Sequence, residues 1–503
     1  MIEILDTTLR DGEQTSGVSF SSSEKLHIAR FLLSKVNVDR LEIASAKVSE
    51  GEFETVKRIT NWATGNGKIN RIEVLGFVDG EISLNWLQAA GARVMNLLCK
   101  GSMKHCREQL RKTPEQHLSD IVNVLNNAKE RDITVNIYLE DWSNGMIHSS
   151  EYVFFLMDNL KDKNIKRFML PDTLGILNPI NTGKLCRLML EKYPELHFDF
   201  HAHNDYDLSV GNVLAAVAAG IKGVHTTVNG LGERAGNAPL ASVIAVLHDQ
   251  MKIDTNIREN ALTEAGRLVE SYAGIRIPNN QPVTGDSVYT QCAGIHADGD
   301  NKNNLYYNDL LPERFGRSRE YALGKLSGKA NIKKNLEAMG MTEIDDADMR
   351  KITERIIELG DKKAGVTQDD LPYIIADVLH LDSNDRISIV NYSFSLSKGL
   401  RPAATVRISI NGAEYEQTAA GDGQYDAFSK VLWKIYTGLG KSTPELTDYN
   451  VSIPRGGKTN ALVQTTISWH FHDKDFKTRG LDADQTAAAI KATVRMLNMI
   501  ENM

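Results

Sequence analysis

Cysteine is scarce in this chain and never occurs in closely spaced pairs. Only four cysteines occur among 503 residues, and no C-x-x-C motif is present. This pattern argues against a disulfide framework and against a zinc site built from thiolates. Any bound metal ion must therefore be held by histidine and carboxylate side chains.

Long apolar runs are also missing. The chain opens with MIEILDTTLRDGEQ, which lacks the basic start and apolar stretch of a secretory signal, and no later apolar run reaches bilayer length. The net charge of -7 comes from 65 acidic and 58 basic residues that are mixed along the chain. We therefore expect a cytoplasmic protein with small-molecule partners, and no binding to nucleic acid or membrane.

Three widespread signatures of cofactor binding or catalysis are absent. The sequence has no P-loop, no convincing dinucleotide fingerprint between a first strand and a helix, and no G-x-S-x-G elbow. ATP, redox dinucleotides and serine-hydrolase chemistry therefore have no support in the sequence.

Up to residue 232 the chain alternates short β-rich runs with helical stretches. This alternation is typical of a parallel sheet covered by helices. Eight such runs in less than about 250 residues predict an α/β fold, the (β/α)8 TIM barrel. The runs are residues 2–9, 40–45, 71–77, 93–100, 134–141, 167–173, 197–205 and 223–232.

Polar residues gather at the carboxyl ends of these runs. TIM barrels place their active sites at that face, so we expect these side chains to meet at one barrel mouth. They are Arg10, Asp11, Gln14, Glu42, Glu140, Asp141, Asp172, Thr173, His201, His203 and Asn229.

The run HFDFHAHND (197–205) predicts a metal site. Residues i and i+2 of a strand point to the same side, so His201 and His203 can reach a single ion. Asp11 at the same mouth supplies a third ligand, and Asn237 adds an oxygen ligand or holds a bound water. Such a set leaves positions open for substrate, as in catalytic sites. The alternative is histidines that serve only as buried hydrogen-bond partners.

These ligands suit a reaction that activates a carbonyl group. A divalent ion that chelates a keto acid through its carboxylate and carbonyl oxygens makes the carbonyl carbon open to a carbanion. Glu140 is a candidate general base for an acidic C–H, and Arg10 is placed to steady the developing oxyanion. The simpler alternative for Arg10 is an ion pair with Asp11 that only caps a strand.

Three parts are expected along the chain. They are a TIM-barrel catalytic domain over residues 1–275, helical linker subdomains over 276–385 and a carboxyl-terminal α+β domain over 386–503. The linker contains GIHADGDNKNNLYY (294–307), which resembles a long functional loop more than a core element.

The last part shows an internal repeat. Residues 404–435 and 463–493 share a pattern in which a strand hairpin leads through a Gly/Asp turn into a helix. We interpret them as two ββα halves of a pseudo-twofold domain. The alternative is chance, because this pattern is common.

Several motifs together resemble the signatures of a known family. They are LRDGEQ (9–14) with Lys25 after it, H-x-H-N-D (201–205), NGLGERAGN (229–237) and GIHADG (294–299). They are similar to those of the α-isopropylmalate and homocitrate synthase family of metal-dependent acyl-CoA condensing enzymes. The resemblance runs the whole length, and the last part resembles a LeuA-type allosteric domain. It implies a divalent ion (Mg, Mn or Zn), acetyl-CoA as co-substrate and a domain-swapped homodimer.

The resemblance also implies that Asp11, His201 and His203 bind the ion, with Asn237 near it. It implies that Glu140 is the base that acts on the acetyl methyl group. It further implies that Arg10 and Thr173 hold the keto acid and that Gln14 assists in the same mouth. His296 and Tyr306, from the linker, would reach the active site of a neighbouring subunit.

Within the family the chain resembles the citramalate-forming branch, which condenses acetyl-CoA with pyruvate. Asp207 stands where the general signature usually has glycine, a departure that looks shared with this branch. The features are LEIASAKVS (41–49), VLGFVDG (74–80), NLLCKGS (96–102), YLEDWSNG (138–145) and HNDYDLSVGN (203–212).

Leu75, Leu98 and Tyr138 are expected to line the pocket for the side chain of the keto acid. Such a pocket leaves room for a methyl group but crowds an isopropyl or carboxyethyl group, and it offers no charge for a second carboxylate. The alternative is that the two leucines are ordinary barrel residues.

A set of residues in the last part resembles the regions that bind the end-product amino acid at the dimer interface. For the citramalate branch the implied effector is isoleucine. The alternative is that these residues form only the core of the domain. The set is Tyr425, Asp426, Leu446, Tyr449, Ile453 and Val463.

We therefore expect an acyltransferase that forms citramalate from pyruvate and acetyl-CoA, for isoleucine biosynthesis. The alternatives are an isopropylmalate synthase that takes 2-oxoisovalerate in leucine biosynthesis, a retro-aldol lyase, and an amino-acid sensor that kept the barrel without the activity.

Overall fold

The computed structural model describes residues 2–300, 302, 305–324, 327–338, 344–361, 371–378, 386–452, 463–472, 474–482 and 484–501. The chain falls into two compact units, Met1–Thr290 with Lys302–Glu320 and Gln291–Asn301 with Tyr321–Met503. Within the described part, no helix combines the length and the apolar character needed to cross a bilayer.

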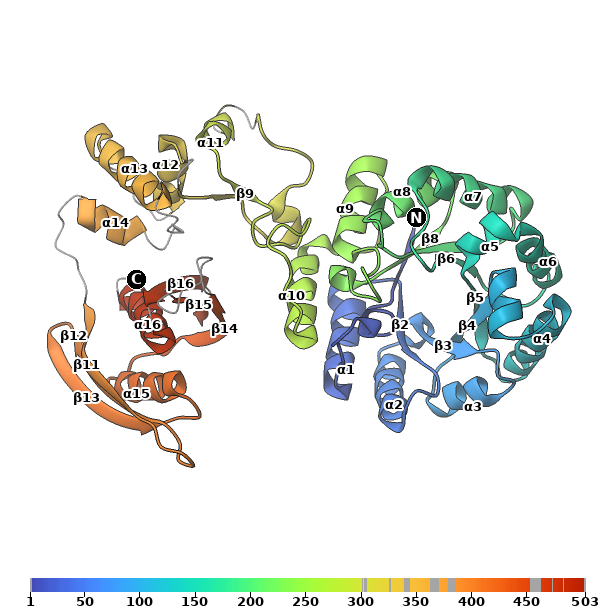
Figure 1. The fold of residues 1–503 in the computed structure, drawn as a ribbon, viewed down its shortest axis with the longest axis horizontal. Helices are drawn as coiled ribbons and strands as arrows, with labels where there is room; N and C mark the ends of the chain where they lie inside the picture. Colours follow the sequence, from blue (N-terminus) through green and yellow to red (C-terminus); the bar gives the residue numbers. More distant parts are fainter. Residues whose placement is uncertain are drawn as a thin grey trace. The chain divides into compact units, whose positions relative to one another are not determined.

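The first unit contains a closed barrel of eight strands that follow one another around the ring in chain order. The strands are parallel, and β1 closes the ring by pairing with β8. Figure 1 shows this ring with helices around its outside. The prediction of a TIM barrel is confirmed. The strands are β1 (Glu3–Asp6), β2 (Arg40–Ser45), β3 (Ile72–Phe77), β4 (Val94–Lys100), β5 (Thr134–Glu140), β6 (Phe168–Asp172), β7 (Phe198–Ala202) and β8 (Gly223–Thr226).

Four helices of this unit, α1, α2, α4 and α7, begin at residues whose side chains cap them. Ser21 and Glu24 form a reciprocal capping box at the start of α1. Thr113 and Gln116 do the same at α4, where Pro114 occupies the first turn. The helices are α1 (Ser22–Phe31), α2 (Glu50–Gly65), α3 (Ile82–Ala89), α4 (Pro114–Glu130), α5 (Trp142–His148), α6 (Ser150–Leu160), α7 (Pro179–Lys192), α8 (Ser209–Ala219), α9 (Leu240–Met251) and α10 (Leu262–Ala273).

Strand side chains alternate between the helix layer and the barrel interior. On β4, Leu97 is fully buried in the large core between sheet and helices. Its neighbour Leu98 packs in a separate interior cluster with Leu75 and Tyr138. This period of two decides which residues can face the site.

Three strands end at least three residues before their predicted ends, β1 at Asp6, β7 at Ala202 and β8 at Thr226. After β1 the chain turns back on itself, since the backbone N–H groups of residues 10, 11 and 12 all donate to the carbonyl of Thr7. The polar residues that follow these strands therefore belong to loops at the barrel mouth.

The second unit begins with linker helices. The prediction of a loop over residues 294–307 is wrong for residues 294–300, which form a helix. A helix of two turns is too short to show apolar periodicity in the sequence. Two short strands, β9 (Thr290–Gln291) and β10 (Glu320–Tyr321), pair with each other. The linker helices are α11 (Gly294–Asp300), α12 (Lys329–Ala338), α13 (Asp346–Asp361) and α14 (Leu371–Val378).

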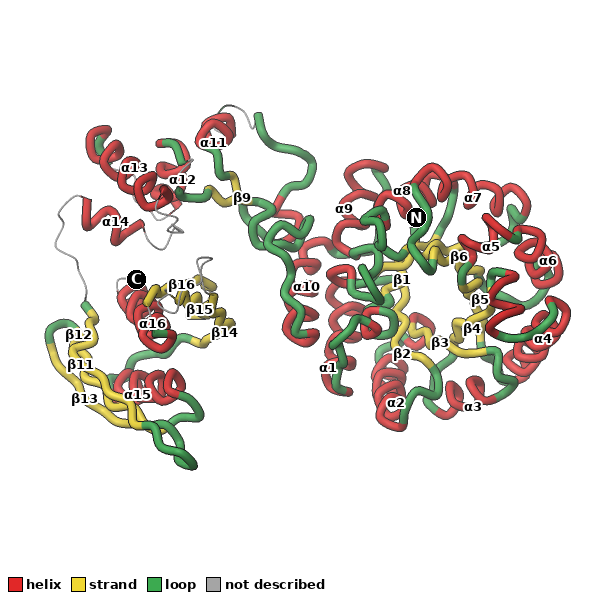
Figure 2. Tube along the Cα trace, viewed as in Figure 1, coloured by secondary structure: helices red, strands yellow, loops and turns green. Residues whose placement is uncertain are grey.

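The carboxyl-terminal part is built from two similar halves. Each half is an antiparallel three-stranded sheet with one helix, so each has one strand more than the predicted hairpin. Figure 2 shows α15 beside the first sheet and α16 beside the second. Both helices contribute to one apolar core. The elements are β11 (Ile387–Ser395), β12 (Ala403–Ile410), β13 (Ala413–Ala420), α15 (Gln424–Gly438), β14 (Glu445–Ser452), β15 (Val463–Phe471), β16 (Lys474–Asp482) and α16 (Gln485–Glu501).

Candidate active site

Asp11 in the loop after β1 meets His201 near the end of β7 and His203 directly after it. One ligand atom from each lies within 4.8 Å of the others, and all three side chains are buried. Asp11 Oδ2 is 3.3 Å from His201 Nε2, and the two imidazole centroids are 5.0 Å apart. The three predicted ligands therefore lie within reach of one ion.

Several polar atoms of this cluster are buried without a hydrogen-bond partner. Folded proteins rarely leave such atoms unsatisfied. Imidazole nitrogens and carboxylate or amide oxygens can each offer a lone pair to a divalent cation. The cluster therefore fits a metal ion. The atoms are Asp11 Oδ1, His201 Nδ1, His203 Nδ1 and Asn237 Oδ1.

Asn237 is held beside His203 by an antiparallel backbone bridge. Its Nδ2 donates to the carbonyl of Leu231 at 3.1 Å, which leaves Oδ1 as the orphan atom. Gly232 has a φ of 153°, and a Cβ at this position would lie 2.2 Å from Asn237 Nδ2. The glycine is therefore required for the loop to approach the asparagine closely.

Arg10 is held on three sides. Its Nε lies 2.6 Å from Glu42 Oε2, its Nη1 lies 3.0 Å from Asp11 Oδ2, and its Nη2 donates to the Tyr138 hydroxyl at 3.4 Å. The strand-capping ion pair with Asp11 thus exists, but it is only one of three contacts. The guanidinium is fixed beside the predicted metal ligands.

The charges of the cluster suit metal binding. Burial by itself would raise the pKa of Asp11, but Arg10 and the two histidines lower that pKa well below its usual value. Burial lowers the pKa of His203 to about 4, so its ring is neutral near pH 7. Ionised carboxylate and neutral imidazole are the forms that ligate metals.

The predicted base, Glu140, ends β5 directly opposite Lys100 at the end of β4. The two side chains form an ion pair, in which Glu140 is 24% exposed and Lys100 is 9% exposed. The carboxylate is therefore open to the mouth on one side and contacts a cation on another.

The expected pocket residues lie in the barrel interior. Leu75 and Tyr138 are buried in one cluster with Leu5 and Met169, and Leu98 packs against it. Because Tyr138 also contacts Arg10, this apolar cluster adjoins the predicted metal ligands.

The spacing between LRDGEQ and Lys25 has a structural role. Lys25 is 1% exposed, and its Nζ lies 2.6 Å from Glu13 Oε2 and pairs with Glu52 as well. Glu13 also accepts from the backbone N–H of Phe20 at 2.9 Å. These contacts tie the loop after β1 to the helices α1 and α2. Gln14 lies in this loop and is exposed.

Thr173 follows β6 directly and is tied into the mouth. Its hydroxyl accepts from the backbone N–H of Asp141 at 2.9 Å, and its carbonyl accepts from Arg234 at 2.8 Å. Arg234 also holds Asp205 through two hydrogen bonds. Asp207 has a φ of 58°, the left-handed region that favours glycine and tolerates aspartate.

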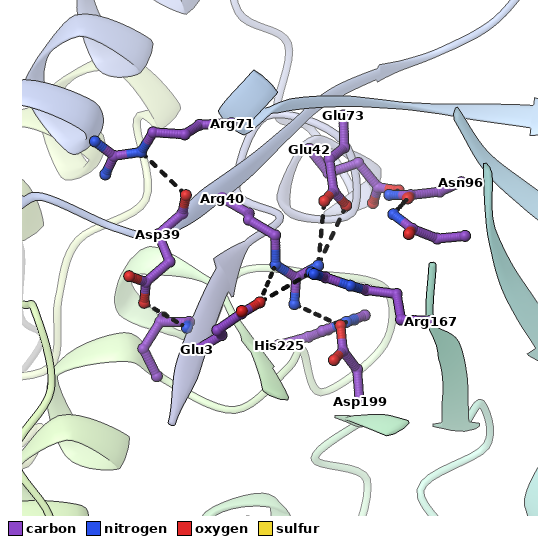
Figure 3. Close-up of polar contacts among 12 residues, drawn as sticks. Glu3, Asp39, Arg40, Glu42, Arg71, Glu73, Asn96, Arg167, Asp199 and His225 are labelled. Atoms are coloured by element: carbon purple, nitrogen blue, oxygen red, sulfur yellow. Dashed lines mark hydrogen bonds and ion pairs between the residues drawn. The ribbon is translucent and has the colours of Figure 1, made fainter. Parts of the chain in front are cut away.

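Beneath the mouth, the barrel interior holds a polar network around Arg40 (Figure 3). Arg40 lies 3.2 Å from Glu3, 3.2 Å from Glu73 and 2.5 Å from Asp199. Asp199 Oδ2 is in turn 3.2 Å from His225 Nε2. Burial would raise the pKa of Asp199, but Arg40 lowers it well below its usual value. Burial lowers the pKa of His225 to about 3.

The two predicted linker residues belong to different units. His296 lies on α11 in the second unit, where its Nδ1 is 3.2 Å from Gln291 Oε1. Tyr306 belongs to the first unit and is 42% exposed. Their expected place in the site of a neighbouring subunit stays a prediction.

Of the residues expected to bind an effector, Tyr425 and Tyr449 contact each other. Their ring centroids are 5.2 Å apart, and the Tyr425 hydroxyl lies 2.7 Å from Thr493 Oγ1. Burial raises the pKa of Tyr425 to about 12. The pair packs against the apolar core of the carboxyl-terminal part.

The other expected effector residues are more dispersed. Asp426 pairs with Lys430 one turn along α15 at 2.7 Å, Leu446 is 41% exposed, and Val463 begins β15. Ile453 lies outside the described residues. A role of these residues in effector binding stays a prediction.

Lys100, Asp199 and His225 were not predicted as site residues. The sequence feature that could have identified them is the alternation of side chains along each strand. Lys100 comes two residues after Leu98, and Asp199 comes two residues before His201, so each faces the interior with its neighbour. What their side chains contact depends on other strands.

Family comparisons cover nearly the whole chain. Residues 1–269 match the family described as HMGL-like. Residues 283–364 match the homocitrate synthase post-HMGL domain-like family, and residues 365–501 match the LeuA allosteric (dimerisation) domain.

Curated relatives carry two kinds of name. A putative (R)-citramalate synthase CimA from Methanopyrus kandleri is 34% identical over 93% of this chain and 89% of its own length. A probable 2-isopropylmalate synthase from the same organism is 34% identical over 99% of this chain and 98% of its own. The (R)-citramalate synthase CimA of Methanocaldococcus jannaschii is 31% identical over the full length of both chains.

Proposed function

The chain belongs to the HMGL-like family of CoA-dependent condensing enzymes, and we propose that it condenses acetyl-CoA with pyruvate and hydrolyses the thioester to give citramalate and CoA. The observation that carries this proposal is the buried cluster of Asp11, His201 and His203, whose ligand atoms lie within 4.8 Å of one another. The cluster adjoins Arg10 and, through it, the apolar interior cluster that contains Leu75 and Tyr138.

The residues of the site can divide the chemistry among them. Glu140 removes a proton from the acetyl methyl group, and the resulting carbanion attacks the carbonyl carbon of pyruvate to form the new C–C bond. Arg10 steadies the charge on the carbonyl oxygen, which takes up the proton that Glu140 removed and becomes the hydroxyl of the product. Water then adds to the thioester carbonyl, and CoA leaves as its thiol.

Asp11, His201 and His203 would hold a divalent Mg, Mn or Zn ion, with Asn237 beside it. Such an ion polarises the acceptor carbonyl when it is bound. The neutral His203 ring and the ionised Asp11 support this assignment.

The choice of pyruvate is supported by the interior cluster. Leu75 and Tyr138 are buried there and Leu98 packs against them, so the wall nearest Arg10 is filled by large side chains. A methyl group suits such a wall better than an isopropyl group. The second candidate is 2-isopropylmalate synthesis from 2-oxoisovalerate, which the name of one relative favours.

The deciding experiment measures CoA thiol release with acetyl-CoA and either keto acid. We expect kcat/KM for pyruvate to exceed that for 2-oxoisovalerate by at least about tenfold. A preference for the branched acid would support isopropylmalate synthesis instead. No thiol release with any keto acid would favour a sensor, and cleavage of citramalyl-CoA without its hydrolysis would favour a lyase.

Regulation and assembly form a second part of the proposal. We infer that isoleucine inhibits the enzyme through the carboxyl-terminal domain, and that the active form is a domain-swapped cytoplasmic homodimer that receives His296 and Tyr306 from the partner. The match to a LeuA allosteric (dimerisation) domain supports this. Isoleucine should lower thiol release where leucine at the same concentration does not.

Sedimentation should show particles of two chains. Monomers with full activity would contradict the proposal that each active site receives His296 and Tyr306 from the partner.

A further inference from the structure

Four polar side chains form an unbroken chain of contacts beneath the predicted metal cluster. Asp199 Oδ2 lies 3.2 Å from His225 Nε2, His225 Nδ1 lies 2.9 Å from the Tyr138 hydroxyl, and that hydroxyl accepts from Arg10 Nη2 at 3.4 Å. Asp199, His225 and Tyr138 are each at most 2% exposed. The chain of contacts joins β7, β8, β5 and the loop after β1.

The direction of each hydrogen bond follows from the charges around it. Asp199 is paired with the Arg40 guanidinium and is therefore a carboxylate, which can only accept. The facing nitrogen of His225, Nε2, must carry the proton. In a neutral imidazole the other nitrogen, Nδ1, is then an acceptor. Tyr138 therefore donates its O–H to His225.

This direction decides what Tyr138 offers to Arg10. With its proton committed to His225, the phenol oxygen presents lone pairs to the Arg10 guanidinium, which can only donate. Glu42 and Asp11 hold two other sides of the same guanidinium. Glu42, Asp11 and Tyr138 then all accept hydrogen bonds from Arg10. The guanidinium therefore keeps one orientation toward the substrate.

We propose that His225 and Asp199 are positioning residues that fix the O–H direction of Tyr138 and, through Tyr138, the orientation of Arg10. This inference rests on the proposed function, in which Arg10 binds the keto acid. His225 touches no substrate in this arrangement. Its removal should therefore weaken pyruvate binding specifically.

The alternative is that His225 only fills buried space and satisfies Asp199. A matched pair of variants separates the two roles. The amide of His225→Asn reaches the place of Nδ1 and can still accept from Tyr138, whereas the longer amide of His225→Gln reaches the place of Nε2 and can donate to Asp199. We call the contacts from Asp199 through His225 and Tyr138 to Arg10 the relay. If the relay positions Arg10, asparagine is the better substitute for His225. If His225 only fills space and satisfies Asp199, glutamine is the better substitute.

Steady-state kinetics with acetyl-CoA and pyruvate test the relay. We expect His225→Gln to raise KM for pyruvate about tenfold and to leave KM for acetyl-CoA within about twofold, because one hydrogen bond to the pyruvate-binding group is lost. His225→Asn should raise KM for pyruvate less than about threefold. In a Tyr138→Phe background the glutamine substitution should add less than about twofold, since both changes remove the same contact. The relay would be overturned if the effects of His225→Gln and Tyr138→Phe on KM for pyruvate multiply in the double variant. It would also be overturned if His225→Asn raises this KM more than His225→Gln does.

A second measurement does not depend on activity. In protein labelled with 15N-histidine, the signals of His225 are those that disappear in His225→Asn, a variant whose near-ultraviolet circular dichroism confirms the native fold. We expect the Nε2–H tautomer of His225, in which Nε2 donates to Asp199 and Nδ1 accepts from Tyr138. An Nδ1–H tautomer would overturn the relay even if the enzyme makes citramalate. The expected tautomer in a protein that does not use pyruvate would overturn the proposed function and leave the relay intact.

Discussion

Lys100 and Glu140 end neighbouring strands of the barrel in register, and their side chains form an ion pair at its mouth. The pair places a cation against the proposed base. The Lys100 ammonium group therefore helps to hold the Glu140 carboxylate in place at the mouth.

Replacement of Lys100 by methionine should lower kcat for citramalate formation by about 10-fold or more, because the side chain that holds the Glu140 carboxylate at the mouth is lost. The measurement is thiol release at saturating acetyl-CoA and pyruvate. Lys100→Arg keeps an ion pair with Glu140 and serves as the control. Full activity in Lys100→Met would show that the ion pair does not position the base.

Removal of a proposed metal ligand should weaken metal binding. We expect chelation by EDTA to abolish thiol release and Mn²⁺ or Mg²⁺ to restore it, because Asp11, His201 and His203 converge within 4.8 Å. His203→Ala should raise the Kd for Mn²⁺, measured by calorimetry, at least about 100-fold.

The matched control for the metal experiment is His248→Ala. The His248 side chain is 47% exposed on α9, so this change should leave the Kd for Mn²⁺ unaltered. Equal affinities in the two variants would show that the cluster does not bind the ion.

Leu98 and Leu97 are adjacent leucines that face opposite sides of β4, which allows a matched test of the pocket. Leu98→Ala should open space in the interior cluster and raise kcat/KM for 2-oxobutyrate relative to pyruvate by about 10-fold or more. Leu97→Ala should destabilise the fold by about 2–5 kcal/mol without a change of selectivity. Equal selectivity in both variants would remove Leu98 from the pocket.

Asp6 should make the stability of the barrel depend on pH. It is fully buried, its Oδ1 accepts from the backbone N–H of Thr8 at 2.9 Å, and burial raises its pKa to about 7 from the usual 3.8. Between these values the folded chain holds a proton that the unfolded chain has lost, so this contribution to stability declines as pH rises toward 7 and is absent above it.

Asp6→Asn keeps the shape and the acceptor but cannot ionise. The variant should therefore gain about 1–4 kcal/mol relative to the parent at pH 8, compared with pH 5. Thermal unfolding at both values measures this difference. Asp254→Asn, at an exposed position, should show no such gain. A gain that is the same at both pH values would contradict the burial argument.

The barrel and the ligand cluster were accessible from the sequence because their signals are local. Strand-like runs at regular intervals predicted the barrel, and the position of Asp11, His201 and His203 at the carboxyl ends of these runs predicted their meeting. The extra strand in each terminal half was not predicted. In β11 the alternation of Ile387 and Ile389 is interrupted by a bulge before Tyr392 and Phe394. Most of β11 is exposed or half-buried on both faces.

The sequence by itself determined which residue types stand at the mouth, because a strand's period of two and its carboxyl end are properties of a short segment. Only the tertiary structure decided which of them touch. Closure of β1 against β8 places Asp6 beside Thr226, and strand register sets Lys100 opposite Glu140. The contacts of His225 with Asp199 and Tyr138 also join three separate strands. Such pairs depend on hydrogen-bond register and ring closure, which no single segment encodes.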